Sequence, residues 1–144
     1  MNDRRPVFKI LSSKDIPEIS ILGQQLNPSL STDQILGRLT QMFEYPNYRC
    51  FGLYIGQELM GIVSGWITVR LYSGKQIELD NAIIESSVQS QGLGKFFFDS
   101  VEAWAKQNQC CTIELNTYIE NSKSHKFYFK EGYSILGFHF QKQT

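Results

Sequence analysis

Three runs of strand-forming residues follow one another closely in the middle of the chain. The first two lie within CFGLYIGQELMGIVSGWITVRLY and flank Gly56 and Gln57, a two-residue connection typical of a β-hairpin. The third run, QIELDNAII over 76–84, comes directly after the turn-forming sequence SGK. These runs predict an antiparallel meander, and the rest of the chain has to cover that sheet.

A short strand is predicted over 7–11, and two amphipathic helices are predicted after it. Asp15 is expected to cap the first helix, and Ser31, at the start of STDQ, is expected to cap the second. After each cap the apolar residues recur every three or four positions, which is the period of one buried helix face. They are Ile16, Ile19, Leu22 and Leu26 in the first helix, and Ile35, Leu36, Leu39, Met42 and Phe43 in the second.

Beyond the meander, the sequence predicts a helix, a strand, a short helix and a closing strand. The first of these helices carries Leu93, Phe96, Phe97, Val101 and Trp104 at helical spacing. Strands are expected over 111–118 and 133–140, with a helix from Asn121 to Gly132 between them. A strand, a helix and a strand in succession imply a parallel pair joined by a right-handed crossover. The element order β-α-α-β-β-β-α-β-α-β predicts one mixed α/β domain over residues 1–144.

Length and composition exclude several classes of protein. A chain of 144 residues with 42% hydrophobic residues can fill one core, and a formal net charge of zero argues against nucleic-acid binding. No apolar run reaches the roughly 20 residues that span a bilayer, and no secretory signal is recognised. Three cysteines offer neither a disulfide framework nor metal-ligand spacing, so we expect free thiols in the cytoplasm, no metal and no membrane.

A glycine-bearing segment, SSVQSQGLGKFFF over 86–98, joins the last strand of the meander to the next helix. Glycines at such a junction expose backbone N–H groups at a positive helix end, which is typical of an anion site. The segment is not a Walker A loop, because Gln89 and Phe96 replace its required glycine and hydroxyl residue. Phe97 likewise replaces the third glycine of a dinucleotide-binding fingerprint.

The pattern that fits is Q-x-x-G-x-G from Gln89 to Gly94. In this motif the sequence resembles the GCN5-related N-acetyltransferase (GNAT) superfamily, with the size of a small stand-alone member. NSKSHKFYFKEGY, from Asn121 to Tyr133, is similar to a second segment of that family, and the element order also agrees. The resemblance implies the GNAT fold, in which a parallel strand pair splays apart, and acetyl-CoA as the co-substrate.

The resemblance also implies roles for individual residues. Backbone N–H groups of Gln89, Gln91, Gly92, Leu93, Gly94 and Lys95 would bind the pyrophosphate, with possible side-chain contacts from Gln91 and Lys95. Backbone groups of Ile83 and Ile84 would pair with the pantetheine arm, and the amide of Ile84 would stabilise the oxyanion. Tyr128 would protonate the leaving thiolate, unless it is only a core aromatic. Asn121 would contact the cofactor arm, or simply cap its helix.

The general base is left open by the sequence. Asn81 stands where family members often have an acid, and Asp80 would face the opposite side of a regular strand. A β-bulge would re-aim Asp80. The other candidates are Glu78, Glu85, Glu114 and a water relay.

The resulting functional hypothesis is transfer of an acetyl group from acetyl-CoA to a primary amine, by direct attack in a ternary complex. The acceptor is expected to be a small molecule. The resemblance implies that its groove is built by the first two helices and their loop, at 23–34, a stretch of little charge, together with strand ends near the C-terminus. A protein acceptor and a non-catalytic acetyl-CoA sensor or interaction module are the alternatives. A homodimer is also expected from the family.

Overall fold

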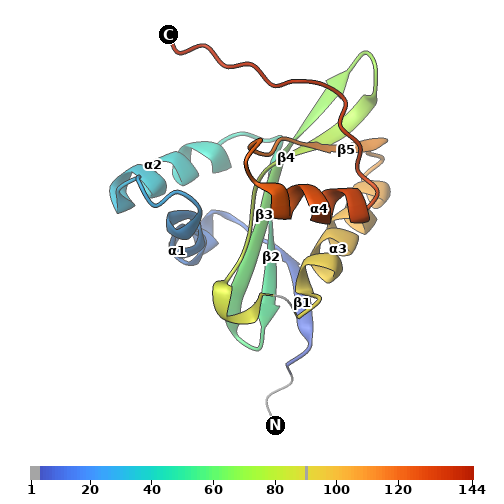
Figure 1. Ribbon diagram of the computed structural model, residues 1–144. Coiled ribbons are helices and arrows are strands. Elements are labelled where there is room, and N and C mark those ends of the chain that lie inside the picture. The colour runs from blue at the N-terminus through green and yellow to red at the C-terminus, as the bar shows by residue number, and fades with distance from the viewer. Residues whose placement is uncertain (1–3, 90) are drawn as a thin grey trace. The chain divides into compact units, whose positions relative to one another are not determined.

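The computed structural model describes residues 4–89 and 91–144 (Figure 1). They fall into two compact units, one ending at Glu114 and one over Leu115–Thr144, which are described separately. The first unit contains β1 (Pro6–Ile10), η1 (Ser13–Asp15), α1 (Ile16–Leu26), α2 (Thr32–Phe43), β2 (Tyr48–Ile55), β3 (Glu58–Arg70), β4 (Gly74–Ile84), η2 (Ser86–Val88) and α3 (Leu93–Gln107). β5 (Thr112–Leu115) ends at the boundary, and α4 (Ser122–Lys130) belongs to the second unit.

The sheet confirms the predicted meander. Its strand order is β1-β2-β3-β4-β5, with β1 to β4 antiparallel and β5 parallel to β4. The β2–β3 hairpin turns at Gly56 and Gln57 as predicted, and Gly56 has φ 61°, a left-handed conformation that glycine adopts without strain. The mixed α/β fold is therefore confirmed.

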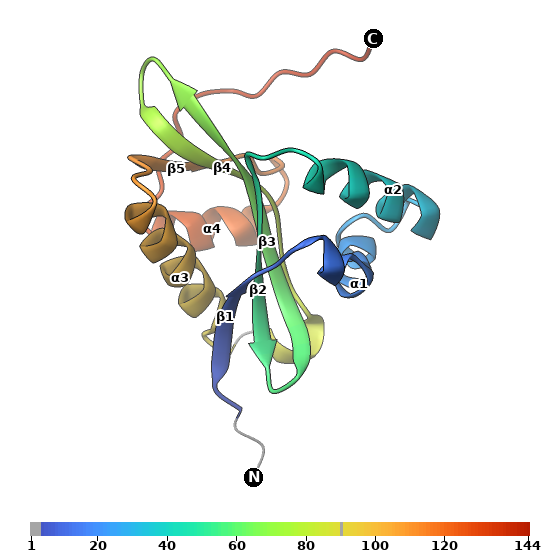
Figure 2. The ribbon, with the colours of Figure 1, turned by 180° about the vertical axis from the view of Figure 1, so that it is seen from behind.

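Helices cover both faces of the sheet. α1 and α2 lie on one face and α3 lies on the other (Figures 1 and 2). Against α1 and α2 the core includes Ile19, Leu22, Ile35, Leu39, Tyr48 and Cys50. On the α3 face, Phe51 meets Trp104 with ring centroids 4.9 Å apart, and Phe97 and Val101 are fully buried. The apolar period of each helix thus predicted its buried face.

The helix caps follow the sequence in one case and differ in the other. Ser31 caps α2 and forms a capping box with Gln34, as STDQ predicts. Asp15 occupies the N-cap position of α1 as predicted, but its side chain makes no capping hydrogen bond there, because the carboxylate accepts the N–H of Ser12 at 2.8 Å. Ser12 and Asp15 form a capping box one turn earlier, around η1.

In the second unit, α4 begins after Asn121, and Gly132 follows its end with φ 92°. The prediction of a closing strand over 133–140 is wrong: this segment forms neither helix nor strand. Its apolar residues Ile135, Leu136, Phe138 and Phe140 are exposed. Alternating apolar residues favour a strand, but a strand also needs a partner for its backbone hydrogen bonds, and residues 133–140 are paired with no strand of the sheet.

Candidate active site

A β-bulge in β4 places Asp80 and Asn81 on the same side of the sheet. Ser64 of β3 pairs with Asn81, but the next residue, Gly65, pairs with Leu79, so Asp80 is an extra residue with no partner of its own. Gly65 permits this arrangement, since a Cβ atom there would lie 2.6 Å from the carbonyl oxygen of Glu78. The β-bulge that would re-aim Asp80, which the sequence could not decide, is therefore present.

Hydrogen bonds from β3 hold the Asp80 carboxylate in place. Its Oδ1 accepts the hydroxyl of Ser64 at 2.6 Å, and its Oδ2 accepts the indole N–H of Trp66 at 2.8 Å. Asn81 in turn donates to the Ser64 hydroxyl oxygen at 3.2 Å. The Trp66 ring packs against Tyr48, with centroids 4.8 Å apart, which fixes the direction of its N–H. The carboxylate is oriented but still exposed to an incoming molecule.

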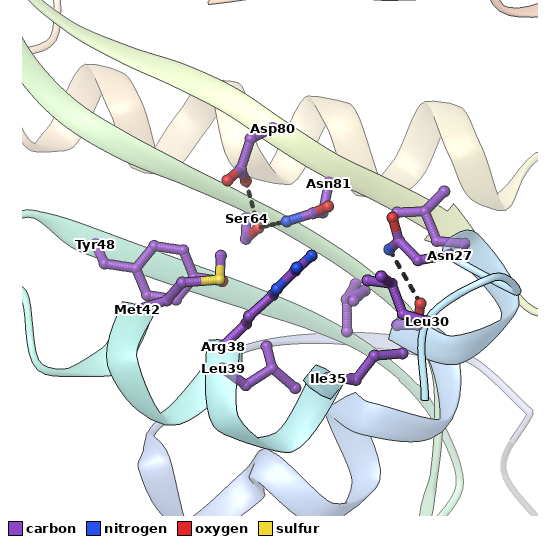
Figure 3. Close-up of a pocket in the computed structure, with 13 residues that line it drawn as sticks. Asn27, Leu30, Ile35, Arg38, Leu39, Met42, Tyr48, Ser64, Asp80 and Asn81 are labelled. Carbon is purple, nitrogen blue, oxygen red and sulfur yellow. Dashed lines mark hydrogen bonds between the residues drawn. The ribbon is translucent and has the colours of Figure 1, made fainter. Parts of the chain in front are cut away.

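Asp80 and Asn81 line a cavity of about 240 Å³ between the sheet and helices α1 and α2 (Figure 3). The polar wall comes from the strands, while the helices contribute mostly apolar side chains. The full lining is Gly23, Leu26, Asn27, Leu30, Ile35, Arg38, Leu39, Met42, Tyr48, Ile62, Ser64, Asp80 and Asn81. Burial raises the pKa of the Tyr48 phenol, which at neutral pH is the neutral group and can both donate and accept a hydrogen bond.

The other three candidate carboxylates lie outside this cavity. Glu78 forms an ion pair with Arg70 at 3.5 Å, and Glu114 accepts the Tyr72 hydroxyl at 2.8 Å. Glu85 accepts the backbone N–H of Ser87 at 2.8 Å, and its bonds to Ser87 lower the pKa of its carboxyl group. Among the four predicted carboxylates, which are all described, Asp80 alone lines the cavity.

The glycine segment leads into the N-terminus of α3. Gly92 is the N-cap with φ 74°, and a Cβ atom there would meet nothing within 4 Å, so an anion can approach the backbone closely. The first N–H groups of a helix lack intrahelical partners and carry its positive dipole end. The backbone of Gln91, Leu93 and Gly94 therefore fits an anionic group, while Ser90 of the same motif lies outside the described residues.

Two side chains of this segment have partners within the chain. Gln89 donates its side-chain N–H to the carbonyl of Ile84 at 2.8 Å, which ties the loop to the end of β4. Lys95 forms an ion pair with Asp99, one turn further along α3, at 3.3 Å. The Lys95 side chain is thus engaged within α3, and the exposed backbone at Gly92 is the feature of this segment that fits an anionic group.

The end of β4 runs beyond β5. Cys111, just before β5, donates its N–H to the carbonyl of Lys75 at 2.7 Å, near the start of β4. Because β5 has 4 residues and β4 has 11, the stretch that contains Ile83 and Ile84 extends past the last residue of β5. On its other side, this stretch pairs with β3 through Ile62 and Gly61.

Tyr128 and Asn121 lie in the second unit. Burial raises the pKa of the Tyr128 phenol, and its ring packs against Phe127 and Tyr133, each with centroids 5.6 Å away. The side chain of Asn121 accepts the N–H of Ser124 at 3.2 Å, so it does cap α4. The Nε2 atom of His125 lies 2.9 Å from the carbonyl oxygen of Tyr118.

The sequence did not point to Ser64 and Arg38, which line the cavity, or to Trp66, which donates a hydrogen bond to Asp80. A usable signal existed in GIVSGW, where Ser64 and Gly65 interrupt an otherwise apolar buried strand. A polar residue in such a run needs a hydrogen-bond partner, and a glycine marks a bulge or a close approach.

A meander sheet, a glycine-bearing helix start and a cavity with an oriented carboxylate fit the fold and site that the sequence predicts for an acetyltransferase. The family model described as Acetyltransferase (GNAT) family matches residues 20–133, and the chain belongs to this family. It is thus a GNAT N-acetyltransferase, for which acetyl-CoA is the acetyl donor.

Solved structures share the fold at low sequence identity. One is aminoglycoside N-acetyltransferase AAC(6')-Iy in complex with CoA, with a TM-score of 0.85 and 16% identity over 97% of this chain and 95% of that one. AAC(6')-Ih from Acinetobacter baumannii has a TM-score of 0.80 and 17% identity over 97% and 99%. Ribosomal-protein-alanine N-acetyltransferase from Brucella melitensis biovar Abortus 2308 has a TM-score of 0.81 and 13% identity over 97% and 100%. No curated protein matched the sequence.

Proposed function

We propose that this protein acetylates the primary amine of a small molecule by direct attack in a ternary complex with acetyl-CoA. The observation that supports this most is the Asp80 carboxylate, which is oriented by Ser64 and Trp66 inside a cavity of about 240 Å³. A carboxylate on the wall of a small cavity can attract an ammonium group and take its proton.

The reaction needs three proton movements, because the nitrogen loses two protons and the leaving thiolate gains one. An amine at pH 7 is mostly protonated, so Asp80 accepts a proton and leaves the nitrogen lone pair free to attack the thioester carbonyl carbon. Attack forms the C–N bond and a tetrahedral intermediate that carries an oxyanion. This intermediate collapses as the C–S bond breaks, the thiolate of CoA leaves with the electron pair, and the nitrogen gives up its second proton to solvent. Tyr128 is proposed to protonate that thiolate, since a phenol carries its proton at neutral pH and burial raises the pKa of this one further. No covalent enzyme intermediate is required, and no cysteine takes part.

The donor is proposed to bind along β4 and α3. The free helix N–H groups after Gly92 suit the pyrophosphate, and the backbone of Ile83 and Ile84 suits the pantetheine arm as an added strand. Acetyl-CoA bound there supplies the activated acetyl group, and the amide of Ile84 is proposed to stabilise the oxyanion. Asn121 is proposed to contact the arm as well as capping α4.

Thermal melting with acetyl-CoA, and with ATP as the control, tests the donor site. Ligand at about 100 times its Kd adds about 2.7 kcal/mol, which corresponds to a rise of roughly 10 °C for a domain of this size. CoA thiol release with a panel of amines then tests turnover. A shift without thiol release would indicate a sensor, and no shift, or an equal shift with ATP, would remove the basis of the proposal.

We also propose a homodimer in the cytoplasm. The exposed apolar side chains of 133–140, up to 90% exposed at Phe138, support self-association. Light scattering on the full chain and on a Phe138→Ser, Phe140→Ser variant tests it, and a monomer in both would exclude the dimer.

Free cysteines at 50, 110 and 111 suit a reducing compartment. No helix in the described ranges is long and apolar enough to cross a membrane.

A further inference from the structure

The cavity beside Asp80 contains one side chain of each charge. Among the described residues that line it, Asp80 is the one acidic side chain and Arg38 is the one basic side chain. The other polar side chains of the lining are amides or hydroxyls. The cavity therefore has no net excess of negative charge to offer a cationic acceptor.

Arg38 interrupts the apolar face of α2. Ile35, Leu39 and Met42 lie on this face at spacings of three and four residues, and all three line the cavity. Arg38 lies within the same stripe, and its guanidinium points from α2 into the cavity, toward the strands that carry Ser64 and Asn81 (Figure 3).

The Arg38 guanidinium makes no hydrogen bond or ion pair with another described residue. Other cations of this unit do have partners, such as Arg70 with Glu78 and Lys106 with Glu102. A guanidinium matches the geometry of a carboxylate or a phosphate group through two parallel hydrogen bonds. Its place at an otherwise mostly apolar wall, opposite the polar strand residues, suits a ligand rather than structural pairing.

We propose that the acceptor is a small zwitterion, an amine that also carries an anionic group on a compact apolar skeleton. The amine lies at Asp80 and the anionic group at Arg38, so Arg38 determines specificity. This inference rests on the proposed function and narrows its acceptor.

The remaining walls fit the apolar part of such a molecule. Leu26, Leu30, Ile35, Leu39, Met42 and Ile62 contribute hydrocarbon surface. At about 240 Å³ the cavity is smaller than the roughly 300–1,000 Å³ typical of sites for drug-sized ligands, which favours an acceptor the size of an apolar amino acid. A polycation such as an aminoglycoside would place several ammonium groups near one carboxylate and one guanidinium.

Steady-state kinetics on matched acceptors test this inference. L-leucine is compared with 3-methylbutylamine, which lacks only the carboxylate, and with 1-amino-3-methylbutylphosphonate, in which the anionic group is phosphonate. Kanamycin serves as the polycation. The enzymes are wild type, Arg38→Gln, Arg38→Lys and Arg4→Gln, the last removing an exposed cation that does not line the cavity.

In wild type, we expect kcat/KM to be at least about tenfold higher for an anion-bearing acceptor than for 3-methylbutylamine. Arg38→Gln should lower kcat/KM for that acceptor on the order of tenfold to a hundredfold, with less than about a twofold change for 3-methylbutylamine. Arg38→Lys should retain part of the preference, and Arg4→Gln should change neither value.

Three results would overturn the inference while leaving acetyl transfer intact. The first is equal kcat/KM for L-leucine, its phosphonate analogue and 3-methylbutylamine, and the second is a preference for kanamycin. The third is a loss in Arg38→Gln that is the same for all acceptors. Acetyl-CoA binding without thiol release for any of the amines would instead overturn the proposed function, and the inference with it.

Discussion

Asp80 and Asn81 are consecutive residues of one strand, yet both line the same cavity. Successive strand residues normally face opposite sides of a sheet, and the bulge at Asp80 changes that alternation. Before the bulge, Leu79 is buried in the core; after it, Asn81 joins Asp80 at the cavity. This displacement brings a carboxylate to the side where the sequence alone places only an amide.

Asp80→Asn should lower kcat/KM by about 10²–10⁴-fold, the range for loss of a general base. Asparagine keeps the size of the side chain but cannot take up the proton of the amine. Glu114→Gln is the matched control, since Glu114 bonds Tyr72 outside the cavity and should leave the rate unchanged. Thiol-release kinetics on both variants test whether Asp80 is the general base. Comparable activity of Asp80→Asn and wild type would mean that another group is the base.

Gly65→Ala should destabilise the protein by about 1–3 kcal/mol and reduce activity. The added methyl group would lie 2.6 Å from the Glu78 carbonyl oxygen, so β3 and β4 would have to separate at the bulge that orients Asp80. Gly37→Ala, with nothing within 4 Å of its new atom in the interior of α2, should instead stabilise by about 1 kcal/mol. Urea unfolding measures both, and equal effects would contradict the close approach at Gly65.

Gly92→Ala should weaken acetyl-CoA binding. Gly92 and Gly56 both have positive φ, 74° and 61°, and both have open space around a new Cβ atom. Alanine at either position costs about 1–2 kcal/mol for the left-handed backbone, so the two variants should melt at similarly reduced temperatures. Calorimetric titration should show a higher Kd for Gly92→Ala alone. The same Kd in both variants would place the donor away from α3.

Tyr128→Phe should lower kcat by about 10²-fold or more without a large change in acetyl-CoA affinity, because proton delivery to the leaving thiolate is lost. Tyr133→Phe removes a hydroxyl from a neighbouring ring, 5.6 Å away between centroids, and should remain active. Single-turnover acetyl transfer separates the chemical step from product release. A fully active Tyr128→Phe enzyme would mean that Tyr128 is only a packing residue.

Alkaline pH should destabilise the fold through Cys50. Burial raises the pKa of this thiol from 9.0 to about 12, so the folded chain holds the proton more tightly than the unfolded chain. The resulting stability is fully present below pH 9 and is lost as pH rises toward 12. Between pH 8 and pH 10 the free energy of unfolding should fall by about 1 kcal/mol.

Cys50→Ala should begin less stable at pH 7, because it leaves a small cavity, but should lose less between pH 8 and pH 10. Urea denaturation across this range compares the two slopes. Identical slopes would show that the Cys50 thiol does not contribute to the loss.

Local patterns allowed most of the fold to be predicted. The hairpin at Gly56, the capping box at Ser31 and the apolar faces of three helices depend on residues close in sequence, and all are present. The strand predicted over 133–140 was wrong, because alternating apolar residues indicate β-strand propensity but do not show whether a partner strand is available for the backbone hydrogen bonds. Asp15 is the N-cap residue of α1, but its carboxylate bonds Ser12 in the capping box of η1 instead of capping α1.

The site was predictable only in part, because its geometry depends on pairing between strands. Asp80 was a candidate, but its direction follows from the register of Ser64 and Gly65 sixteen and fifteen residues earlier. Arg38 was missed because the expected acceptor groove ended at Gln34, one helical turn before it. The roles of Tyr128, Asn121, Ile83 and Ile84 stay predictions.

The cavity draws its walls from two parts of the chain. Helices α1 and α2 and the loop between them supply Arg38 and most of the apolar residues, whereas β3 and β4 supply Ser64, Asp80 and Asn81. Recognition and proton transfer can therefore vary independently. Substitutions confined to 23–42 would change the amine that the cavity accepts and leave the hydrogen bonds between β3 and β4 unchanged. Evolution or protein engineering can then change the acceptor without rebuilding the strands that carry Asp80.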